Sequence, residues 1–379
     1  MNEIPPDFAI PAATPPDASF SNEHDRATWE EATRRIAALA GAVPAGEPGW
    51  MRWPAGGGDY FVPRDTLLVE EARALGITRD TQFFGGAVPH RFVASKAISH
   101  GLISADARAP EGWQAGLAVH LGNAVLRGYT AFAVEDARIA GQLMLKHGPA
   151  RLKEVEATSG QGQTVVASEQ ELEAALAAID PARIEAGGLV IEENLCEVET
   201  YSVGTIGLPG RRDAPSASAL RSFAYWGTQR LTRNNRGEAA YGGSRLHVVR
   251  GGFEELQREL LSHERAEAVR KALLYDRAVF AAYPALFASR RNYDVAEGTD
   301  AGGRIRIGVL EQSWRIGGAT GAEIAACEYL EAHPEKAGVT CATVEIYGNP
   351  LAAPPDAAVY YAGVDPVAGP LTKYAQIIE

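Results

Sequence analysis

A lysine, a glycine-rich loop and a group of glutamates follow one another between residues 151 and 202. Lys153 precedes the run EATSGQGQ, in which Gly160 and Gly162 allow backbone N–H groups to approach an anion closely. The lysine adds a point charge for phosphate oxygens. The chain has no P-loop signature, and this run has no Rossmann fingerprint, so the pattern predicts a phosphate-binding loop of another kind. A simple hairpin turn is the alternative for the loop.

The glutamates follow the apolar strand predicted for GLVIEENL. Glu192, Glu193 and Glu199 lie at or beyond the end of that strand, and Leu195 lies among them. A carboxylate in this position can accept hydrogen bonds from an adenine amino group or from ribose hydroxyls, while the backbone near Leu195 reads the edge of the base. The alternative is an acidic, solvated exit from a strand.

A second group of candidate residues lies on a strand predicted for residues 304–315. The apolar face of this strand continues with polar residues, because Ile305, Ile307 and Val309 share it with Glu311, Ser313 and Arg315. Asp294 lies on the preceding strand, across the hairpin EGTDAGG, so antiparallel pairing would bring it close to Glu311. Two such carboxylates are hard oxygen ligands suited to Mg²⁺. The alternative is a surface hairpin on which Glu311 forms an ordinary ion pair with Arg315.

The elements expected around these residues alternate between strand and helix up to about residue 200, a pattern typical of α/β structure. Ser168 stands three residues before Glu171 and predicts a capped helix start. An apolar helix face, made of Leu172, Leu176 and Ile179, indicates that this helix packs on a sheet. Glycine-rich, strand-like segments dominate from Glu199 onward.

The composition is that of a globular protein with two or three subdomains, since the chain has 379 residues, 46% of them hydrophobic and 22% charged. A formal net charge of −12 argues against a nucleic-acid or anionic-membrane partner. Three cysteines without zinc-site spacing suggest a reducing compartment. We find no signal-peptide pattern and no apolar run of membrane-spanning length, and therefore expect a cytoplasmic protein.

Taken together, the lysine, the SGQGQ loop, the VIEENL strand and the Asp294…EQSWR run resemble the ATP-grasp superfamily. The resemblance covers roughly residues 85–325 and is greatest to a bacterial ATP-grasp family of unknown function. It implies an α+β fold in which two α+β subdomains clamp a nucleotide, preceded by a small α/β domain. The domain ranges expected from it are a flexible tail (1–22), an N-terminal α/β domain (23–93), a central nucleotide-clamping subdomain (94–200) and a C-terminal subdomain bearing the metal and substrate site (201–379).

The resemblance assigns roles to individual residues. It implies that Lys153, the loop residues Ser159, Gly160 and Gly162, and an additional lysine, Lys96, contact the nucleotide phosphates. Adenine recognition falls to Glu192 and Leu195, and the ribose carboxylate is Glu199. Metal-binding acids are Asp294 and Glu311, and Arg315 matches the arginine that follows the family's Glu-x-Asn motif. Ser313 departs from the family pattern, because it stands where the metal-binding Asn is usual, and this weakens the case for a second metal ion.

The activity implied is a Mg·ATP-dependent ligation in which a small-molecule carboxylate becomes an acyl phosphate and is attacked by an amine-type nucleophile. Arg230 and Arg233, in the segment QRLTRNN, are candidates for a cationic wall facing the acyl phosphate. The alternatives are an ATP-grasp kinase or phosphotransferase, and a nucleotide-binding regulatory protein without catalysis. A homodimer is compatible with the sequence. His90 and His100 are interpreted as local hydrogen-bonding residues.

Overall fold

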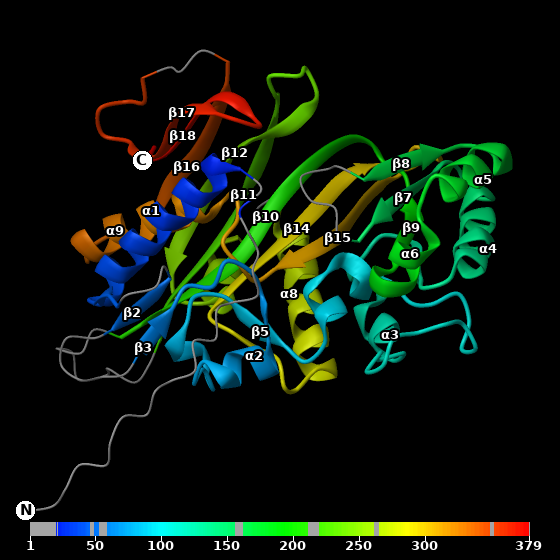
Figure 1. The fold of residues 1–379 in the computed structure, drawn as a ribbon, viewed down its shortest axis with the longest axis horizontal. Helices are drawn as coiled ribbons and strands as arrows, with labels where there is room; N and C mark the ends of the chain where they lie inside the picture. The colour runs from blue at the N-terminus through cyan, green and yellow to red at the C-terminus, as the bar shows by residue number, and fades with distance from the viewer. Residues whose placement is uncertain are drawn as a thin grey trace, which may run out of the picture.

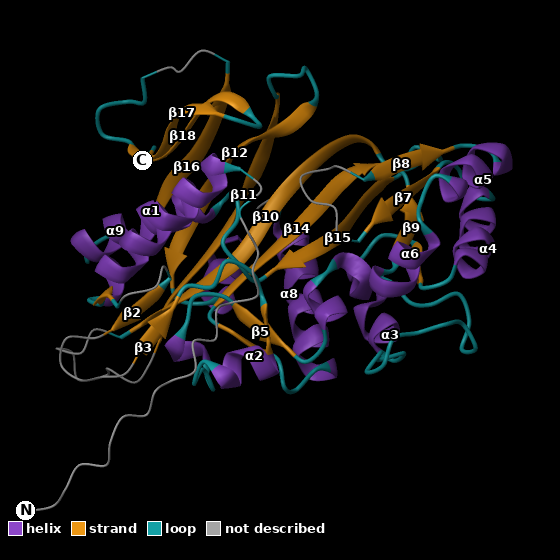
Figure 2. Ribbon diagram, viewed as in Figure 1, coloured by secondary structure: helices purple, strands orange, loops and turns teal. Residues whose placement is uncertain are grey.

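The computed structural model describes residues 20, 22–45, 49–52, 59–155, 162–210, 220–260, 265–348 and 352–378. Ser159 and Gly160 of the predicted phosphate loop, and nearly all of the predicted N-terminal tail, lie outside these residues. Helices and strands are arranged as an α+β protein, as expected from the sequence (Figures 1 and 2). Within the described residues, no helix is long and apolar enough to cross a membrane.

An eight-stranded sheet, called here the large sheet, forms the centre of the molecule (Figure 2). Its strand order is β15-β14-β10-β11-β12-β16-β18-β17, and every neighbouring pair is antiparallel. The strands span Cys196–Pro209 (β10), Leu220–Arg233 (β11), Ala239–Arg250 (β12), Arg290–Thr299 (β14), Ile305–Ser313 (β15), Gly338–Tyr347 (β16), Ala358–Asp365 (β17) and Gly369–Ile377 (β18).

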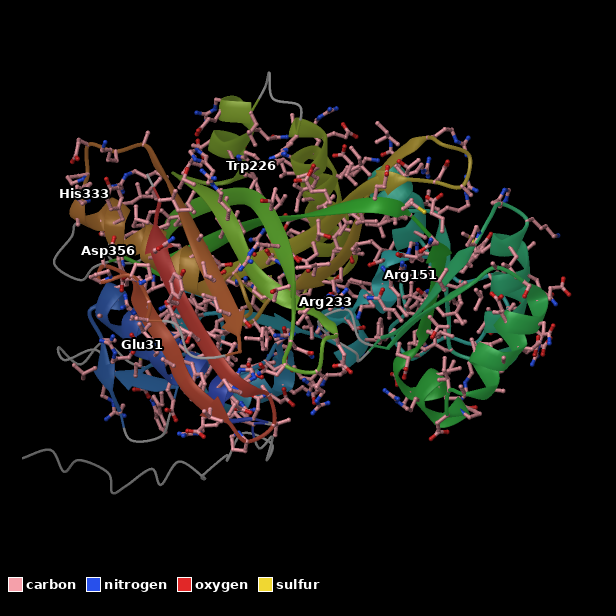
Figure 3. All side chains as sticks on the ribbon, turned by 90° about the horizontal axis from the view of Figure 1, so that it is seen from above. Glu31, Arg151, Trp226, Arg233, His333 and Asp356 are labelled. Atoms are coloured by element: carbon pink, nitrogen blue, oxygen red, sulfur yellow. The ribbon has the colours of Figure 1, made fainter. Side chains whose placement is uncertain are left out.

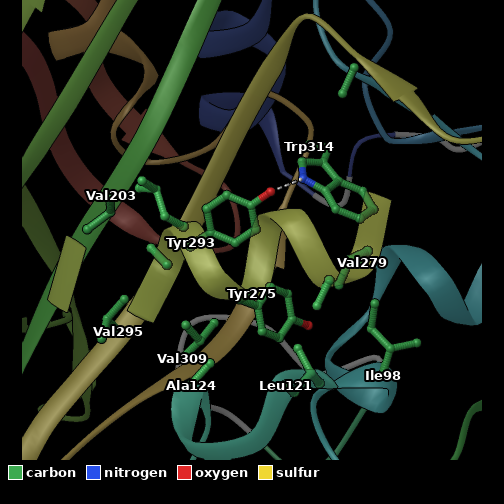
Figure 4. Packing of buried hydrophobic residues seen from close by; sticks show 14 of the residues in the cluster. Ile98, Leu121, Ala124, Val203, Tyr275, Val279, Tyr293, Val295, Val309 and Trp314 are labelled. Carbon is green, nitrogen blue, oxygen red and sulfur yellow. Dashed lines mark hydrogen bonds between the residues drawn. The ribbon is translucent and has the colours of Figure 1, made fainter. Parts of the chain in front are cut away.

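Helices cover both faces of the large sheet. On the face named here the α8 face, α7 (Phe253–Leu260) and α8 (Ala266–Ala282) pack against buried residues such as Tyr201 and Tyr293. Figure 4 shows this packing around Tyr293, with Trp314 donating its indole N–H to the tyrosine hydroxyl. On the opposite face, the α9 face, α9 (Thr320–Ala332) and α1 (Glu23–Ala40) cover a second core. Alternation along each strand therefore decides which face a side chain joins.

A four-stranded sheet, called here the small sheet, lies beyond the β14–β15 end of the molecule (Figure 1). Its order is β6-β9-β7-β8, with strands Gly128–Ala131, Leu189–Glu193, Ala150–Glu154 and Gln163–Val166. Helices α4 (Val134–Leu145) and α5 (Glu169–Ala177) pack on one face, and α6 (Pro181–Gly187) leads into β9. The predicted helix cap is confirmed, since the Ser168 hydroxyl accepts from the Glu171 N–H at 3.2 Å.

The N-terminal elements form two small three-stranded sheets. One contains β1 (Val43–Pro44), β2 (Trp50–Arg52) and β3 (Asp59–Phe61). In the other, β5 (Gly86–Val88) pairs in parallel with β4 (Leu67–Leu68) and antiparallel with β13 (Phe287–Ala288), which precedes β14. Short helices fill the connections: α2 (Val69–Ala74), η1 (Asp80–Gln82), η2 (Arg91–Ala94), η3 (Lys96–Ser99), α3 (Leu117–Leu121) and η4 (Gly122–Ala124). The proposed domain boundaries stay a prediction.

Candidate nucleotide and metal site

Lys96 joins the two sheets. Its side chain is 7% exposed, and its Nζ lies 3.1 Å from Glu311 Oε2 of β15 and 3.4 Å from the carbonyl oxygen of Val155, just after β7. The lysine begins η3, and Ser99 at the other end of this turn donates its hydroxyl to the Leu310 carbonyl at 3.2 Å. The turn is therefore held along the edge strand of the large sheet, and its lysine reaches toward the small sheet.

Lys153, Glu192 and His100 form a buried cluster on the small sheet. Strands β7 and β9 pair so that Lys153 and Glu192 share the face opposite α4 and α5, while Leu152 and Ile191 point into the core under those helices. One Glu192 oxygen pairs with the Lys153 ammonium, and the other lies 3.1 Å from His100 Nε2. Burial opposes ionisation of Glu192, but the lysine and histidine outweigh it and lower its pKa to about 2. Glu192 is thus an ionised, doubly engaged carboxylate.

Asp294 and Glu311 are direct partners in the β14–β15 pairing, so their predicted proximity is confirmed. The prediction that Glu311 shares a face with Val309 is wrong, because the register shifts between Asp294 and Val295 and leaves Val309 in the core of the α8 face. The Asp294 side chain lies on the α9 face, where its Oδ1 accepts from Gln229 Nε2 at 2.8 Å and from Asn292 Nδ2 at 2.9 Å. Burial and the neighbouring Glu311 carboxylate raise the pKa of Asp294 to about 6. Glu311 is about one-third exposed and faces Lys96. Two acids and one lysine therefore meet at the edge of the large sheet.

The two acids fit Mg²⁺. Both supply hard oxygen atoms from adjacent strands, and the pKa of Asp294 is raised by burial and then by repulsion from Glu311, which a divalent cation between them would relieve. No group of three or more His, Cys, Asp or Glu side chains suited to a metal occurs among the described residues. Magnesium at nucleotide sites commonly takes only one or two carboxylates and completes its shell with phosphates and waters. The pair suits a metal ion brought in with a nucleotide.

Ser313 and Arg315 continue from Glu311 along the chain. The Ser313 carbonyl accepts from Arg290 Nη1 at 3.0 Å, and the Ser313 hydroxyl lies 3.5 Å from the same nitrogen. Arg315 points toward Asp65, with Nε 3.4 Å from the carboxylate. Among the described residues, Glu311 pairs with Lys96 rather than with Arg315, so the surface hairpin with a Glu311–Arg315 ion pair is not the arrangement observed.

Two predicted nucleotide-binding glutamates have partners elsewhere in the protein. Glu199 accepts from the Tyr201 hydroxyl at 2.7 Å and lies 3.5 Å from Arg265, on the α8 face of the large sheet. Asp294 is on the α9 face, so the two carboxylates are not brought together. Glu193 is buried and accepts from Arg306 at 3.0 Å, which ties β9 to β15. The nucleotide contacts assigned to Glu199 and Glu193 stay predictions.

The predicted arginines lie on the β11–β12 hairpin. Arg230 donates to the Gly242 carbonyl at 2.7 Å and Arg233 to the Gly237 carbonyl at 2.6 Å, so both guanidinium groups contact the backbone of their own hairpin. Arg230 directly follows Gln229, which contacts Asp294, and alternation turns the arginine toward the other face. Seen from above, Arg233 at the end of β11 and Arg151 on β7 lie on separate elements (Figure 3).

Of the loop residues assigned to phosphate contact, only Gly162 is among the residues that the structure describes. Gly162 has φ 61°, a left-handed conformation that favours glycine, and its carbonyl accepts from the Glu154 N–H at 2.9 Å. This contact continues the β7–β8 pairing from which the loop extends. Leu195 is buried in a small core with Leu126 and Ala296, between the two sheets. The strand end expected to read adenine is therefore anchored at the junction of the sheets.

Comparison with family models supplies the identity of the chain. A model described as "Protein of unknown function (DUF3182)" matches residues 13–375. The chain belongs to the DUF3182 family. A search of curated protein sequences gave no match.

Solved structures of ATP-grasp enzymes match most of this DUF3182 chain at low sequence identity. Biotin carboxylase from Campylobacter jejuni is 13% identical, with a TM-score of 0.47, over 82% of this chain and 68% of that one. The biotin carboxylase domain of 2-oxoglutarate carboxylase from Hydrogenobacter thermophilus is 14% identical, with a TM-score of 0.48, over 82% and 66%. N5-carboxyaminoimidazole synthetase from Staphylococcus aureus is 11% identical, with a TM-score of 0.38, over 68% and 65%. The matches span about two thirds of those chains.

Three residues that contact the candidate site of this DUF3182 chain are not predicted from its sequence. The sequence predicts only local hydrogen bonds for His100, and this prediction is wrong, because His100 contacts Glu192, which lies 92 positions away in the chain. Asn292 was detectable in principle, because it stands two residues before Asp294 and strand alternation puts both on one face. Gln229 had no such signal, since its contact with Asp294 depends on the order of strands in the large sheet.

Proposed function

We propose that the protein is a Mg·ATP-dependent ligase that activates a carboxylate as an acyl phosphate for attack by an amine-type nucleophile. The contact of Lys96 carries the proposal. Its ammonium lies 3.1 Å from Glu311, one of the two acids that fit Mg²⁺, and 3.4 Å from the carbonyl of Val155, which leads into the glycine-rich loop. One of the two acids and the residue that precedes the loop therefore meet at one cation, an arrangement that supports binding of nucleotide phosphates and their metal there.

Lys96 and Lys153 would hold the phosphates. Each is buried and paired with a glutamate, Lys96 with Glu311 and Lys153 with Glu192. Phosphate oxygens would bind these ammonium groups beside the glutamates, since an ammonium has three donors and charge-assisted contacts to phosphate are strong. Both Glu192 oxygens are already engaged by Lys153 and His100. We therefore assign adenine recognition to the backbone near Leu195 rather than to the Glu192 carboxylate.

Asp294 and Glu311 would hold Mg²⁺, with the Ser313 hydroxyl next along the strand. The metal ion supplies charge neutralisation at the transferring phosphoryl group. Gln229 and Asn292 hold Asp294 in place through its Oδ1. This arrangement leaves positioning and charge, rather than covalent catalysis, as the contribution of the side chains.

In the proposed reaction, an oxygen of the substrate carboxylate attacks the γ-phosphorus of ATP, and the bond from that phosphorus to ADP breaks. The nitrogen of the second substrate then attacks the acyl carbon, phosphate leaves with the bonding electrons, and the nitrogen loses its proton to solvent. Lys96 and Arg315 would balance the negative charge that develops on the phosphoryl oxygens. The products are ADP, phosphate and the condensed carboxamide.

A phosphotransferase that stops after the first step is the second candidate. It is favoured by the hairpin contacts of Arg230 and Arg233, whose guanidinium groups donate to backbone carbonyls instead of facing the metal acids. In that case no cationic wall would shield an acyl phosphate from water while it waits for a nucleophile.

The first test is thermal unfolding of the full chain with ATP, with and without Mg²⁺. We expect stabilisation by Mg·ATP in the wild type and its loss in Lys96→Met, because ligand binding to the folded state raises the unfolding midpoint. Lys146→Met, which removes an exposed lysine at the end of α4, is the matched control and should keep the full shift. No stabilisation of the wild type would refute nucleotide binding.

The second test is an untargeted product search by mass spectrometry with a pool of carboxylates and amines. A condensed product formed together with ADP and phosphate supports the ligase. A phosphorylated product with ADP and without condensation supports the phosphotransferase. Binding without turnover in any pool contradicts both enzymatic proposals.

A further inference from the structure

A fully buried ion pair lies directly behind the two metal acids. Arg290 of β14 and Glu323 of α9 are 1% and 0% exposed. Arg290 donates from Nη2 to Glu323 Oε1 at 2.5 Å and from Nε to Oε2 at 3.1 Å, so the contact is bidentate. Burial opposes the charge on Arg290, but Glu323 outweighs it and raises the pKa of the guanidinium. The pair joins the first turn of α9 to the strand that carries Asp294.

The other side of the guanidinium holds the strand that carries Glu311. Arg290 Nη1 donates to the backbone carbonyl of Ser313 at 3.0 Å and to that of Arg315 at 2.6 Å. These two carbonyls lie at the end of β15, where the strand leaves the sheet. The path of the backbone that follows Glu311 is therefore determined by one buried side chain.

A second connection runs from Glu323 to Asp294. Tyr225 is 0% exposed. Its hydroxyl lies 2.7 Å from Glu323 Oε1 and 2.9 Å from Asn292 Oδ1. Asn292 in turn donates from Nδ2 to Asp294 Oδ1 at 2.9 Å. One hydrogen-bonded cluster thus reaches both strands of the metal pair, through Asn292 on β14 and through Arg290 to the end of β15.

A gain in folding stability does not explain why the protein buries Arg290, Glu323 and Tyr225 together. Desolvating two ions costs several kcal/mol each, and well-packed apolar residues often replace a buried ion pair without loss of stability. A fully satisfied polar network instead restricts its members to one arrangement. Residues behind metal ligands orient those ligands, and their loss typically lowers metal affinity by about 10- to 100-fold.

We propose that Arg290, Glu323 and Tyr225 are positioning residues that set the distance and orientation between Asp294 and the Glu311–Ser313 segment for metal binding. The proposal rests on the proposed function for the identity of the metal, although its test does not need turnover. It assigns a role to α9 as well, because Glu323 is in the first turn of that helix.

Tyr225→Phe is the decisive variant, and Tyr293→Phe is its matched control. Both tyrosines are 0% exposed, and both donate to a buried carboxylate, but the Tyr293 hydroxyl contacts Asp276 at 2.6 Å on the α8 face, opposite the face that carries Asp294. We expect Tyr225→Phe to raise the dissociation constant for Mn²⁺, titrated with and without ATP, by about tenfold. Tyr293→Phe should leave it within about twofold, although each variant loses a buried hydroxyl with two hydrogen-bond contacts.

Glu323→Gln provides a second measurement in any preparation that folds. We expect a weakening of Mn²⁺ binding at least as large as in Tyr225→Phe, since both connections pass through this carboxylate. A change under about threefold in Tyr225→Phe, or an equal change in Tyr293→Phe, overturns the proposal. If Mn²⁺ binds the wild type but ATP does not, the proposed function fails while the positioning inference is still decided by the Mn²⁺ titration. A wild type that binds no Mn²⁺ overturns both.

Discussion

Asp294 is ionised at neutral pH at a cost in folding free energy. Its pKa is raised to about 6 by burial and by Glu311, whereas an aspartate in an unfolded chain has a pKa near 4. Between these values the folded state binds more protons than the unfolded state. Stability therefore falls as pH rises through this window, and the loss is complete above pH 6. Charge is retained at a position where a neutral side chain would stabilise the fold.

We therefore predict that Asp294→Asn stabilises the metal-free protein at pH 7 by about 1–3 kcal/mol and abolishes the Mg²⁺ dependence of ATP binding. The gain should shrink toward zero as pH falls from about 6 to 4, because protonated aspartate and asparagine are both neutral. Urea unfolding in EDTA at several pH values measures the first effect, and ATP titration with and without Mg²⁺ the second. Glu297→Gln, on the same strand but the other face, should keep the Mg²⁺ dependence.

Lys153 and Glu192 neutralise each other in the interior of the small sheet. Removing one partner of a buried pair leaves an uncompensated charge, which costs about 3–5 kcal/mol, whereas removing both charges is often neutral. The loss of ATP binding in a Lys153 variant is therefore open to two explanations, a lost phosphate contact or a damaged sheet.

A double variant separates these explanations. We predict that Lys153→Met destabilises the protein by about 3–5 kcal/mol and abolishes stabilisation by Mg·ATP. Adding Glu192→Gln should recover most of the free energy of unfolding without restoring the response to ATP. Urea unfolding and ATP-dependent thermal shifts are the measurements. If ATP stabilises the double variant like the wild type, Lys153 has no role in binding the phosphates.

The junction of the sheets depends on a close approach of backbone to β15. Val125 forms an isolated bridge with Val309, and a Cβ added at Gly308 would lie 2.6 Å from the Leu126 nitrogen. Only a glycine lets the segment that leads into β6 run so close to the edge of the large sheet. The relative position of Lys153 and Glu311 is thus set partly by a residue that contacts neither.

Gly308→Ala should push this segment away from β15 and separate the two halves of the site. We predict a loss of about 1–3 kcal/mol in stability and at least a tenfold weaker binding of Mg·ATP, measured by calorimetry. Gly116→Ala is the control, because its added Cβ meets no atom within 4 Å and its φ of −71° suits alanine. Unchanged affinity in Gly308→Ala would argue against a site shared between the sheets.

The N-terminal elements are integrated into the core of the whole molecule. Trp29 and Ile36 of α1 share a core with Leu246 of β12 and Leu330 of α9, and β5 pairs with β13 next to the large sheet. The small sheet, in contrast, has a core of its own beneath α4 and α5. Cooperative unfolding is expected to follow these cores rather than the order of segments in the chain.

We predict that Trp29→Ala lowers the stability of α9 and the large sheet together with α1, by about 3–5 kcal/mol. Leu172→Ala, at a 0% exposed position in the small-sheet core, should instead raise exchange mainly in residues 128–193. Hydrogen exchange of peptides from both regions measures this. If Trp29→Ala affected residues 20–93 alone, an independently folding N-terminal domain would be favoured.

Part of the candidate site could be predicted, because some of its residues lie close together in the sequence. Asp294 and Glu311 lie on the two strands of one hairpin, so antiparallel pairing predicts that they lie close together. Their direct pairing depends on a register shift between Asp294 and Val295, which the sequence does not predict. The Ser168 cap and the apolar face of α5 follow from neighbouring residues in the same way. In each case the partners are close in sequence, and local geometry leaves few alternatives.

The remaining contacts join residues from distant parts of the chain, where packing and strand order select the partners. His100 meets Glu192, and Gln229 meets Asp294, only after the sheets have formed. The face that Glu199 occupies could not be predicted from the sequence, because the β10–β14 register shifts between Cys196 and Glu199. A register shift of one residue exchanges the two faces of a strand, and no pattern in the neighbouring residues predicts this shift. Residue types and short spacings in the sequence thus predict candidate groups such as Asp294 and Glu311, whereas the packing of the sheets decides which face each side chain occupies.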